Sequence, residues 1–173
     1  MAKTLIAFFS RADENNFRGT MRYVEVGNTE IAVGMIKELI SADVFKMEMK
    51  NSYAKDYKTC INESRQDLRT KARPELVSMP ESIDEYDVVI LAYPNYWGTM
   101  PAPVFTFLEA FDFTGKTILP LCTHEGSGMG ASVRDLRTVC RGVNVENGLA
   151  IRGCEVGESK PQIEKWLKDN KLI

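Results

Sequence analysis

The stretch that decides the fold is YDVVILAYPNYWGTMPAP, residues 86–103. Its apolar run, residues 88–92, shows no alternation of apolar and polar side chains, which is typical of a strand buried on both faces of a parallel sheet. Pro94 lacks the N–H that a strand ladder uses, whereas Pro101 suits the first turn of a helix. We therefore predict that a central strand stops before Pro94, that residues 95–100 form a loop at its carboxyl end, and that a helix opens at Pro101.

Strand-like and helix-like patterns alternate along the rest of the chain. Strands are predicted over residues 4–9, 44–49, 88–92, 117–123 and 147–151, and helices from residue 28, over residues 53–71, from residue 101, through residues 133–140 and from residue 159. Residues 44–49 alternate as a half-covered edge strand does. Pro120 removes one ladder donor from the fourth strand, which is awkward for an interior strand. Ser159 and Gln162 fit a capping box.

This alternation predicts an α/β fold of three layers, with a doubly wound, five-stranded parallel sheet and right-handed crossovers in one domain, residues 1–173. Of the two common strand orders, 2-1-3-4-5 matches the number of strands and the edge-like second strand. The first, third and fourth strands are then neighbours. We therefore expect the loops after Phe9, Tyr93 and Thr123 to meet in one crevice, where open α/β sheets bind ligands.

Composition excludes several classes of function. The chain has 22 basic and 24 acidic residues and no basic block, which argues against binding to nucleic acid or to an anionic membrane surface. No apolar window is long enough to span a bilayer, and no secretory leader is evident, so a cytoplasmic location is expected. The four cysteines form no Cys-x-x-Cys pair and accompany a single histidine, so we predict reduced, buried or incidental thiols and no metal site.

The first of the three loops predicts an anion site. Ser10 ends the first strand, and Gly27, Asn28 and Thr29 precede or open the first helix. Hydroxyl groups and unpaired backbone N–H groups at the positive end of a helix bind phosphate, and glycine allows a close approach of the backbone. The alternative is a plain helix N-cap.

The other two loops predict a flat ligand. Tyr96 and Trp97 offer an aromatic platform, although a lid folded back on the core is an equal alternative. Residues 123–130 are polar and rich in glycine, so their backbone could hydrogen-bond the edge of a heterocycle. The second tryptophan, Trp166, lies in a helical pattern and is predicted to be core. Together the loops suit a mononucleotide with a flat ring system.

The chain resembles the flavodoxin family along essentially its whole length. The phosphate-loop motif of that family, S/T-x-S/T-G-x-S/T, is matched by Ser10 in its first position and by Gly27, Asn28 and Thr29 in its last three. Trp97-Gly98 corresponds to the aromatic-glycine pair beside the flavin ring, and residues 123–128 are similar to the loop on the other side of the flavin.

This resemblance implies one non-covalently bound FMN that cycles between the flavin redox states, with the carbonyl of Gly98 able to turn toward flavin N5 on reduction. The implied cofactor-binding residues are Ser10, Arg11, Gly27, Asn28, Thr29, Pro94, Asn95, Tyr96, Trp97, Gly98, Thr123, His124, Glu125, Gly126 and Gly128. The implied partners are redox proteins, a reductase and an electron acceptor, or a small-molecule acceptor.

The sequence departs from the family pattern in the first loop. Residues 12–26 interrupt the phosphate motif, so that its third hydroxyl position is missing. Either Arg11, Arg18 or Arg22 compensates, or the insert is a solvated surface feature.

Two further departures lie near the expected ring. Thr99 stands where electron-carrier flavodoxins often have an acidic residue. The third loop lacks the tyrosine that many flavodoxins place over the flavin. His124 either takes that position, where it could donate a proton, or is an ordinary loop residue.

Several functions remain in competition. We expect an electron carrier first and, as the alternative, an FMN-dependent NAD(P)H oxidoreductase of quinones or related acceptors. Gly126, Gly128 and Ala131 also fit a dinucleotide fingerprint, with Glu146 about twenty residues on, but after the fourth strand rather than the first. A receiver domain is excluded because Pro94 stands where a carboxylate is needed. An interaction module without a cofactor is a further alternative.

Overall fold

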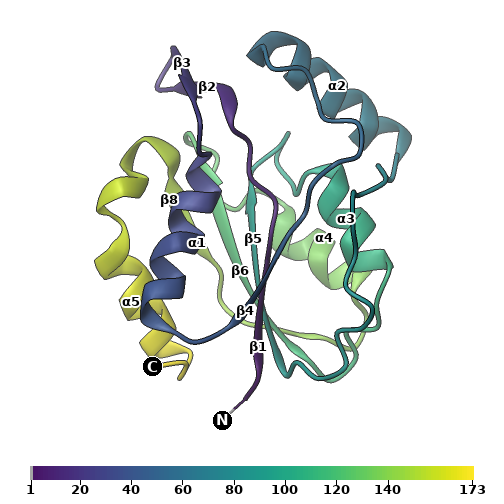
Figure 1. The fold of residues 1–173 in the computed structure, drawn as a ribbon, viewed down its shortest axis with the longest axis vertical. Helices are drawn as coiled ribbons and strands as arrows, with labels where there is room; N and C mark the ends of the chain where they lie inside the picture. Colours follow the sequence, from purple (N-terminus) through teal and green to yellow (C-terminus); the bar gives the residue numbers. More distant parts are fainter. Residues whose placement is uncertain (1) are drawn as a thin grey trace.

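The computed structural model, which describes residues 2–173, is built around one parallel β-sheet with helices on both faces (Figure 1). The strands follow the order β4-β1-β5-β6-β7, and β8 also pairs with β6. Their bounds are β1 Thr4–Phe8, β4 Asp43–Lys46, β5 Val88–Pro94, β6 Thr117–His124, β7 Asn144–Val145 and β8 Leu149–Arg152. Every pairing in this sheet is parallel, so the predicted doubly wound α/β architecture is confirmed.

The helices form the two outer layers (Figure 1). Their bounds are α1 Asn28–Leu39, α2 Tyr57–Thr70, α3 Ala102–Glu109, α4 Ser132–Val139 and α5 Lys160–Asp169. One apolar core lies between the sheet and α1 with α5, and contains Ile36 and Ile163. The other lies on the opposite face beneath α3 and α4, and contains Phe107 and Leu136. The middle of β5 contributes to both cores and is buried on both sides, as its unbroken apolar run predicted.

The sheet has six strands where five were predicted, because the last position is divided between β7 and β8. This division also explains how an interior strand accommodates Pro120. Ile118 directs its carbonyl to the β7 side, where it accepts from the N–H of Glu146 at 3.0 Å, and Pro120, two residues on, faces the same side. On that side, β7 pairs with β6 only as far as Ile118, and β8 pairs with β6 only from Leu121 onward. Pro120 falls in the gap between these two pairings, so its missing N–H removes no hydrogen bond from the sheet.

The central strand reaches one residue farther than predicted. β5 ends at Pro94, which lies in register with Thr123 of β6. Pairing continues for one more bond, because the N–H of Asn95 donates to the carbonyl of Thr123 at 2.8 Å. The proline therefore stands at the very end of the ladder, where its missing N–H costs little.

Two other elements are shorter than predicted. β4 ends at Lys46 because Met49 leaves the sheet and forms an isolated antiparallel bridge with Leu76. α2 begins after Asp56, whose carboxylate accepts from the N–H of Thr59 at 2.8 Å and caps the helix. The four residues before the helix were wrongly predicted to be helical.

The C-terminal helix confirms one prediction and contradicts another. Ser159 has helical φ and ψ angles of −86° and −4°, and its hydroxyl donates to the carbonyl of Val156 at 2.7 Å. Because its side chain does not accept from the first turn of α5, the capping box is absent. Trp166 is 6 % exposed and lies in the core, as predicted.

The insert at residues 12–26 folds into an antiparallel hairpin, which the sequence analysis did not predict. Its strands are β2 Asp13–Phe17 and β3 Thr20–Val24. The hairpin stands beyond the carboxyl ends of the sheet strands, beside the N-terminal end of α2 (Figure 1). Glu14 fastens it there, because its N–H donates to the carbonyl of Lys55 at 3.2 Å and its carboxylate accepts from the N–H of Tyr57 at 2.9 Å.

Two further findings bear on the sequence predictions. The cysteines are free; Cys60, Cys122 and Cys140 are buried and Cys154 is partly exposed, which agrees with the prediction of unpaired thiols. Within residues 2–173, no helix combines the length and the apolar character needed to cross a membrane.

Candidate functional site

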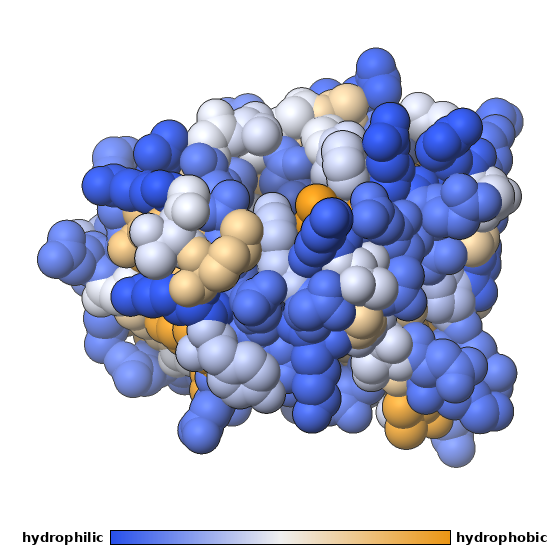
Figure 2. Space-filling model, turned by 90° about the horizontal axis from the view of Figure 1, so that it is seen from above, coloured by the Kyte–Doolittle hydropathy of each residue, from blue (hydrophilic) through white to orange (hydrophobic). Residues whose placement is uncertain are grey.

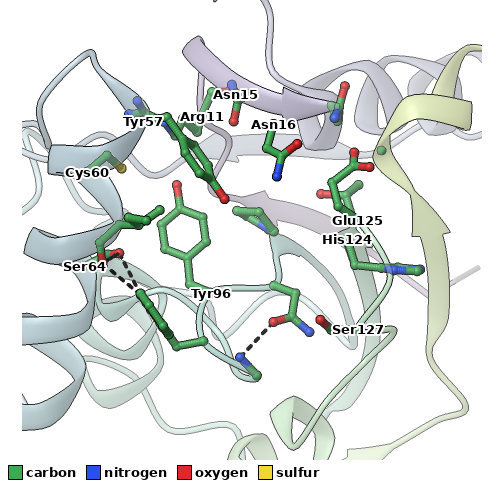
Figure 3. A pocket seen from close by; sticks show the side chains of 18 residues that line it. Arg11, Asn15, Asn16, Tyr57, Cys60, Ser64, Tyr96, His124, Glu125 and Ser127 are labelled. Carbon is green, nitrogen blue, oxygen red and sulfur yellow. Dashed lines mark hydrogen bonds between the residues drawn. The ribbon is translucent and has the colours of Figure 1, made fainter. Parts of the chain in front are cut away.

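A cavity of about 340 Å³ lies at the carboxyl ends of β5 and β6, between α2 on one side and the third loop on the other (Figure 3). The hairpin covers it from above. Ten of the predicted site residues line it, namely Arg11, Asn28, Pro94, Asn95, Tyr96, Trp97, Gly98, Thr123, His124 and Glu125. The surface at this end of the molecule is mostly hydrophilic, with apolar residues scattered over it (Figure 2).

The first loop is organised around the N-terminus of α1. The first N–H groups of a helix have no hydrogen-bond partner within the helix. Here the backbone N–H of Glu30, in the first turn of α1, donates to Ser10 Oγ at 3.1 Å. The Ser10 hydroxyl can still donate its proton to an anion. The N–H groups of Asn28 and Thr29 belong to the same positive turn, which is a ready site for phosphate.

Gly27 allows this arrangement because it has no side chain. A Cβ at this position would lie 2.3 Å from the carbonyl oxygen of Arg11 and 2.4 Å from Ser10 Oγ. The glycine thus lets the end of the first strand and the N-terminus of α1 lie in direct contact.

The Thr29 side chain does not face the cavity. Its hydroxyl lies 2.7 Å from that of Thr123, and both residues are buried. Thr29 therefore ties the first loop to the end of β6, and only its backbone N–H remains available for an anion.

The second loop is a tight turn that projects Trp97. The N–H of Tyr96 donates to the carbonyl of Thr99 at 2.9 Å, and the reverse bond is 3.1 Å. Trp97 and Gly98, the two residues between Tyr96 and Thr99, have φ angles of 55° and 81°, respectively, as in a type I′ turn. The left-handed conformation, rare for a bulky residue, directs the indole outward.

Trp97 is held in this exposed position by α2. Its side chain is 51 % exposed, and Nε1 donates to the carbonyl of Ile61 at 3.0 Å and to Ser64 Oγ at 3.3 Å. The guanidinium of Arg65 lies 5.0 Å from the ring centroid. The platform is thus fixed at the cavity rim and is not folded back on the core. The lid alternative fits Tyr96 better, since its ring packs edge-on against Phe9.

The third loop packs on the second through glycines. Ala131 donates its N–H to the carbonyl of Gly98 at 2.7 Å, and a Cβ on Gly130 would lie 2.4 Å from the same oxygen. Turning the Gly98 carbonyl toward a ligand would require breaking this bond. Two residues that fit a dinucleotide fingerprint thus serve contact between the loops, Ala131 through this bond and Gly128 through its carbonyl, which accepts from Asn95 Nδ2 at 2.9 Å.

His124 lines the cavity, but its ring points away from the middle (Figure 3). Its Nδ1 accepts from the N–H of Gly126 at 2.9 Å. Burial and the nearby Arg152 lower its pKa, so the imidazole is neutral at pH 7. This placement favours a role in shaping the loop.

Two cavity side chains contain polar atoms without partners. The hydroxyl of Tyr96 and both carboxylate oxygens of Glu125 are buried and make no hydrogen bond with any group in residues 2–173. Burial raises the pKa of Tyr96 well above its usual value, so its hydroxyl stays protonated. Such groups are costly unless a ligand or water satisfies them.

The arginines proposed to compensate for the missing hydroxyl are bound to protein groups. Arg11 Nη2 donates to the carbonyl of Lys55 at 2.8 Å, Arg18 pairs with Glu155, and Arg22 stacks on a phenylalanine of the hairpin. Only Arg11 lines the cavity.

The other predicted residues do not line this cavity, namely Ser10, Gly27, Thr29, Gly126 and Gly128. Ser10 instead lines an adjoining cavity of about 260 Å³ that shares Arg11 and Tyr96 with the first. The sequence analysis missed eight lining residues, namely Asn15, Asn16, Tyr57, Cys60, Ile61, Ser64, Ser127 and Gly153. Four of the missed residues lie on one face of α2. The sequence contained a sign of this face, because the stripe of Tyr57, Ile61 and Ser64 is too narrow for a helix that packs on the core. The hairpin residues had no sequence signal, because their place depends on how the insert folds back.

Comparisons with known proteins bear on the family and the fold of the chain. A family model described as flavodoxin matches residues 20–170. Solved structures similar to the chain include a protein from Bacteroides uniformis named as a flavoprotein, with 26% identity, a TM-score of 0.75, and coverage of 96% of this chain and 98% of that one. A second, from Bacteroides eggerthii, has 24% identity and a TM-score of 0.77 over all of both chains.

A flavoprotein from Lactobacillus acidophilus in complex with FMN has 18% identity and a TM-score of 0.64, and covers 91% of this chain and 98% of that one. At this identity the likeness concerns the fold alone. No curated protein sequence matches the chain significantly.

Proposed function

We propose that this chain, which belongs to the flavodoxin family, binds one FMN non-covalently in the cavity under the hairpin and transfers electrons through it. The observation that carries the proposal is the position of Trp97. A half-exposed indole, fixed in a left-handed turn and tied to α2, leaves one large apolar face at the rim of a cavity. Such a face is suited to stacking on a flat ring.

The residues present fit FMN. The cavity volume of about 340 Å³ falls in the range of about 300–1,000 Å³ usual for small-molecule sites. The positive turn at Asn28 and Thr29, with the Ser10 hydroxyl, would hold the phosphate. Trp97, which lies on the opposite wall of the cavity, would hold the ring. FMN supplies a group that accepts and returns electrons reversibly.

The chain's own residues position and shield this group. Residues of the hairpin and of α2 line the cavity and would flank the bound group, whereas Trp97 at the rim would keep the ring near the surface. A ring edge near the surface suits electron exchange with a docked protein, so we propose redox proteins as the partners.

One observation favours the alternative function, an FMN-dependent NAD(P)H oxidoreductase. The Tyr96 hydroxyl is buried in the cavity wall without a hydrogen-bond partner among residues 2–173, and burial raises its pKa further, so it is protonated at neutral pH. It could therefore donate a hydrogen bond to the oxygen of a quinone-like acceptor. A carrier does not need this donor.

Three measurements test the proposal. The untreated protein should be yellow, or the apo-protein should quench the fluorescence of added FMN with a single saturable site. A colourless protein that leaves FMN fluorescence unchanged would overturn it. Oxidation of NADPH by a quinone, measured without a partner reductase, separates the two functions: fast turnover supports the oxidoreductase, and its absence supports the carrier.

A further inference from the structure

Glu125 is the most unusual charged side chain in the cavity. Both of its carboxylate oxygens are buried and lack a hydrogen-bond partner among residues 2–173. An ionised carboxylate accepts hydrogen bonds and donates none, and an unsatisfied one is expensive to bury. Its position therefore calls for a donor that the protein itself does not supply.

The protein's cations near this carboxylate do not satisfy it. Arg18 pairs with Glu155 at the rim, and Arg152 lies on the side of His124, whose pKa it lowers. The Asn28 amide also lies near the carboxylate. A Cβ on Gly153 would lie 2.6 Å from Glu125 Oε1 and 2.3 Å from Asn28 Nδ2, so the two groups border the same small space without forming a hydrogen bond.

That space lies toward the phosphate end of the cavity. Asn28 is the first residue of α1, whose positive N-terminus would hold the phosphate. Trp97 belongs to the opposite wall, where it is tied to Ile61 and Ser64 of α2. Figure 3 shows Glu125 across the cavity from Ser64, with Tyr96 standing between the two sides.

FMN contains two kinds of hydrogen-bond donor, the ring N3–H and the hydroxyl groups of the ribityl chain that joins ring to phosphate. Beside the phosphate end, the ribityl hydroxyls are the donors within reach. The phosphate itself only accepts and carries the same charge as the carboxylate. A hydroxyl that donates to a carboxylate makes a short, strong bond.

We infer that Glu125 accepts hydrogen bonds from the ribityl hydroxyls, and so selects flavins that carry a polyol chain. This inference rests on the proposed binding of FMN. The positive N-terminus of α1, which begins at Asn28, favours a negative group at this place.

The test compares three flavins that differ only in the chain. Lumiflavin has the ring with its N3–H and no ribityl chain, riboflavin adds the chain, and FMN adds the phosphate. Dissociation constants are measured by fluorescence titration of apo-protein for the parent, Glu125→Gln and Glu125→Ala. Glu158→Gln, which removes an exposed carboxylate that does not line the cavity, is the matched control, and circular dichroism checks folding.

We expect Glu125→Gln to weaken the binding of riboflavin and FMN by the same factor, about tenfold, as for a lost charge-assisted hydrogen bond. Glu125→Ala should weaken both further. Lumiflavin binding should not change, and Glu158→Gln should bind all three flavins as the parent does.

Each other outcome overturns the inference in a recognisable way. An equal loss for lumiflavin would assign Glu125 to the ring N3–H. Tighter FMN binding with unchanged riboflavin binding would show that the carboxylate only repels phosphate. Unchanged affinities for all three flavins would leave Glu125 without a role in binding. If the parent protein binds none of the three flavins, the proposed function itself fails.

Discussion

The side-chain amide of Asn95 donates a hydrogen bond from Nδ2 to the carbonyl oxygen of Gly128 at 2.9 Å. Residues 33 positions apart are thereby joined, and the second loop is tied to the third. The same amide uses Oδ1 to accept from the N–H of Gly98 at 2.9 Å. One asparagine thus holds both the turn that presents Trp97 and the loop that faces it.

Replacement of Asn95 should loosen both loops. Asn95→Ala leaves the Gly98 N–H without a partner and leaves the Gly128 carbonyl with only the weak donor Cys122 Sγ, at 3.6 Å. We therefore expect the free energy of unfolding to fall by about 1 to 3 kcal/mol, measured by urea denaturation. Asn95→Asp keeps the acceptor and should lose less. The exposed Asn51 provides the control, because Asn51→Ala should unfold at the parent's urea concentration. Equal midpoints for Asn51→Ala and Asn95→Ala would contradict the prediction.

Two glycines of the first helix region should respond in opposite ways to alanine. At Gly27 the added Cβ would lie 2.3 Å from the Arg11 carbonyl, so we expect Gly27→Ala to destabilise the protein by about 1 to 3 kcal/mol and to weaken FMN binding. At Gly34, inside α1, a Cβ meets nothing within 4 Å, so Gly34→Ala should stabilise by about 0.5 to 1 kcal/mol. Thermal unfolding of both variants is the measurement. A stabilised Gly27→Ala variant would show that the close contact is not needed.

The two tryptophans allow a matched comparison. Trp97→Ala should weaken FMN binding by on the order of 1 kcal/mol or more through lost stacking. Trp97→Phe keeps an aromatic ring but loses the hydrogen bond to Ile61, so its FMN affinity should lie between those of the parent protein and Trp97→Ala. Trp166 also donates its indole N–H, to the carbonyl of Asn147 at 2.9 Å, but in the core. Trp166→Phe should therefore lower stability and leave FMN affinity unchanged. A fluorescence titration that finds equal affinity for Trp97→Ala and the parent protein would remove Trp97 from the site.

The single histidine should make stability depend on pH. Burial lowers the pKa of His124 below its usual 6.5, so the unfolded chain binds a proton that the folded protein resists. His124 therefore does not lower the free energy of unfolding above about pH 6.5, where the imidazole is neutral in both states. As the pH falls through and below that value, protonation of the unfolded chain lowers the free energy of unfolding. We expect the parent protein to lose more stability than His124→Gln between pH 8 and pH 5, measured by urea denaturation at each pH. Parallel losses in the two proteins would contradict this.

The central strand shows why much of the fold was predictable. An apolar run of residues 88–92 needs cover on both faces, and both cores meet on it. Pro94 and Pro120 were harder to place, since their effect depends on which neighbour the missing N–H would face. The division of the last strand into β7 and β8 leaves that side of Pro120 unpaired, and nothing near residue 120 in the sequence announces it.

The site was predictable only in part, and for a similar reason. The loops after β5 and β6 could be assigned because the ends of neighbouring parallel strands must meet. By contrast, Asn16 of the hairpin and Tyr57 of α2 line the cavity because Glu14 fastens these two elements together. A single side chain in an insert leaves no periodic pattern to detect.

Local residue pattern was therefore enough to establish the alternating α/β order and the edge at which the loops gather, because burial and helix periodicity are written in neighbouring residues. Three-dimensional packing alone established that Trp97 stands exposed against α2 and that the Glu125 carboxylate has no hydrogen-bond partner in the described part of the chain, residues 2–173. Whether a polar group is satisfied depends on contacts between residues far apart in the chain, and the same contacts determine what the cavity is suited to bind.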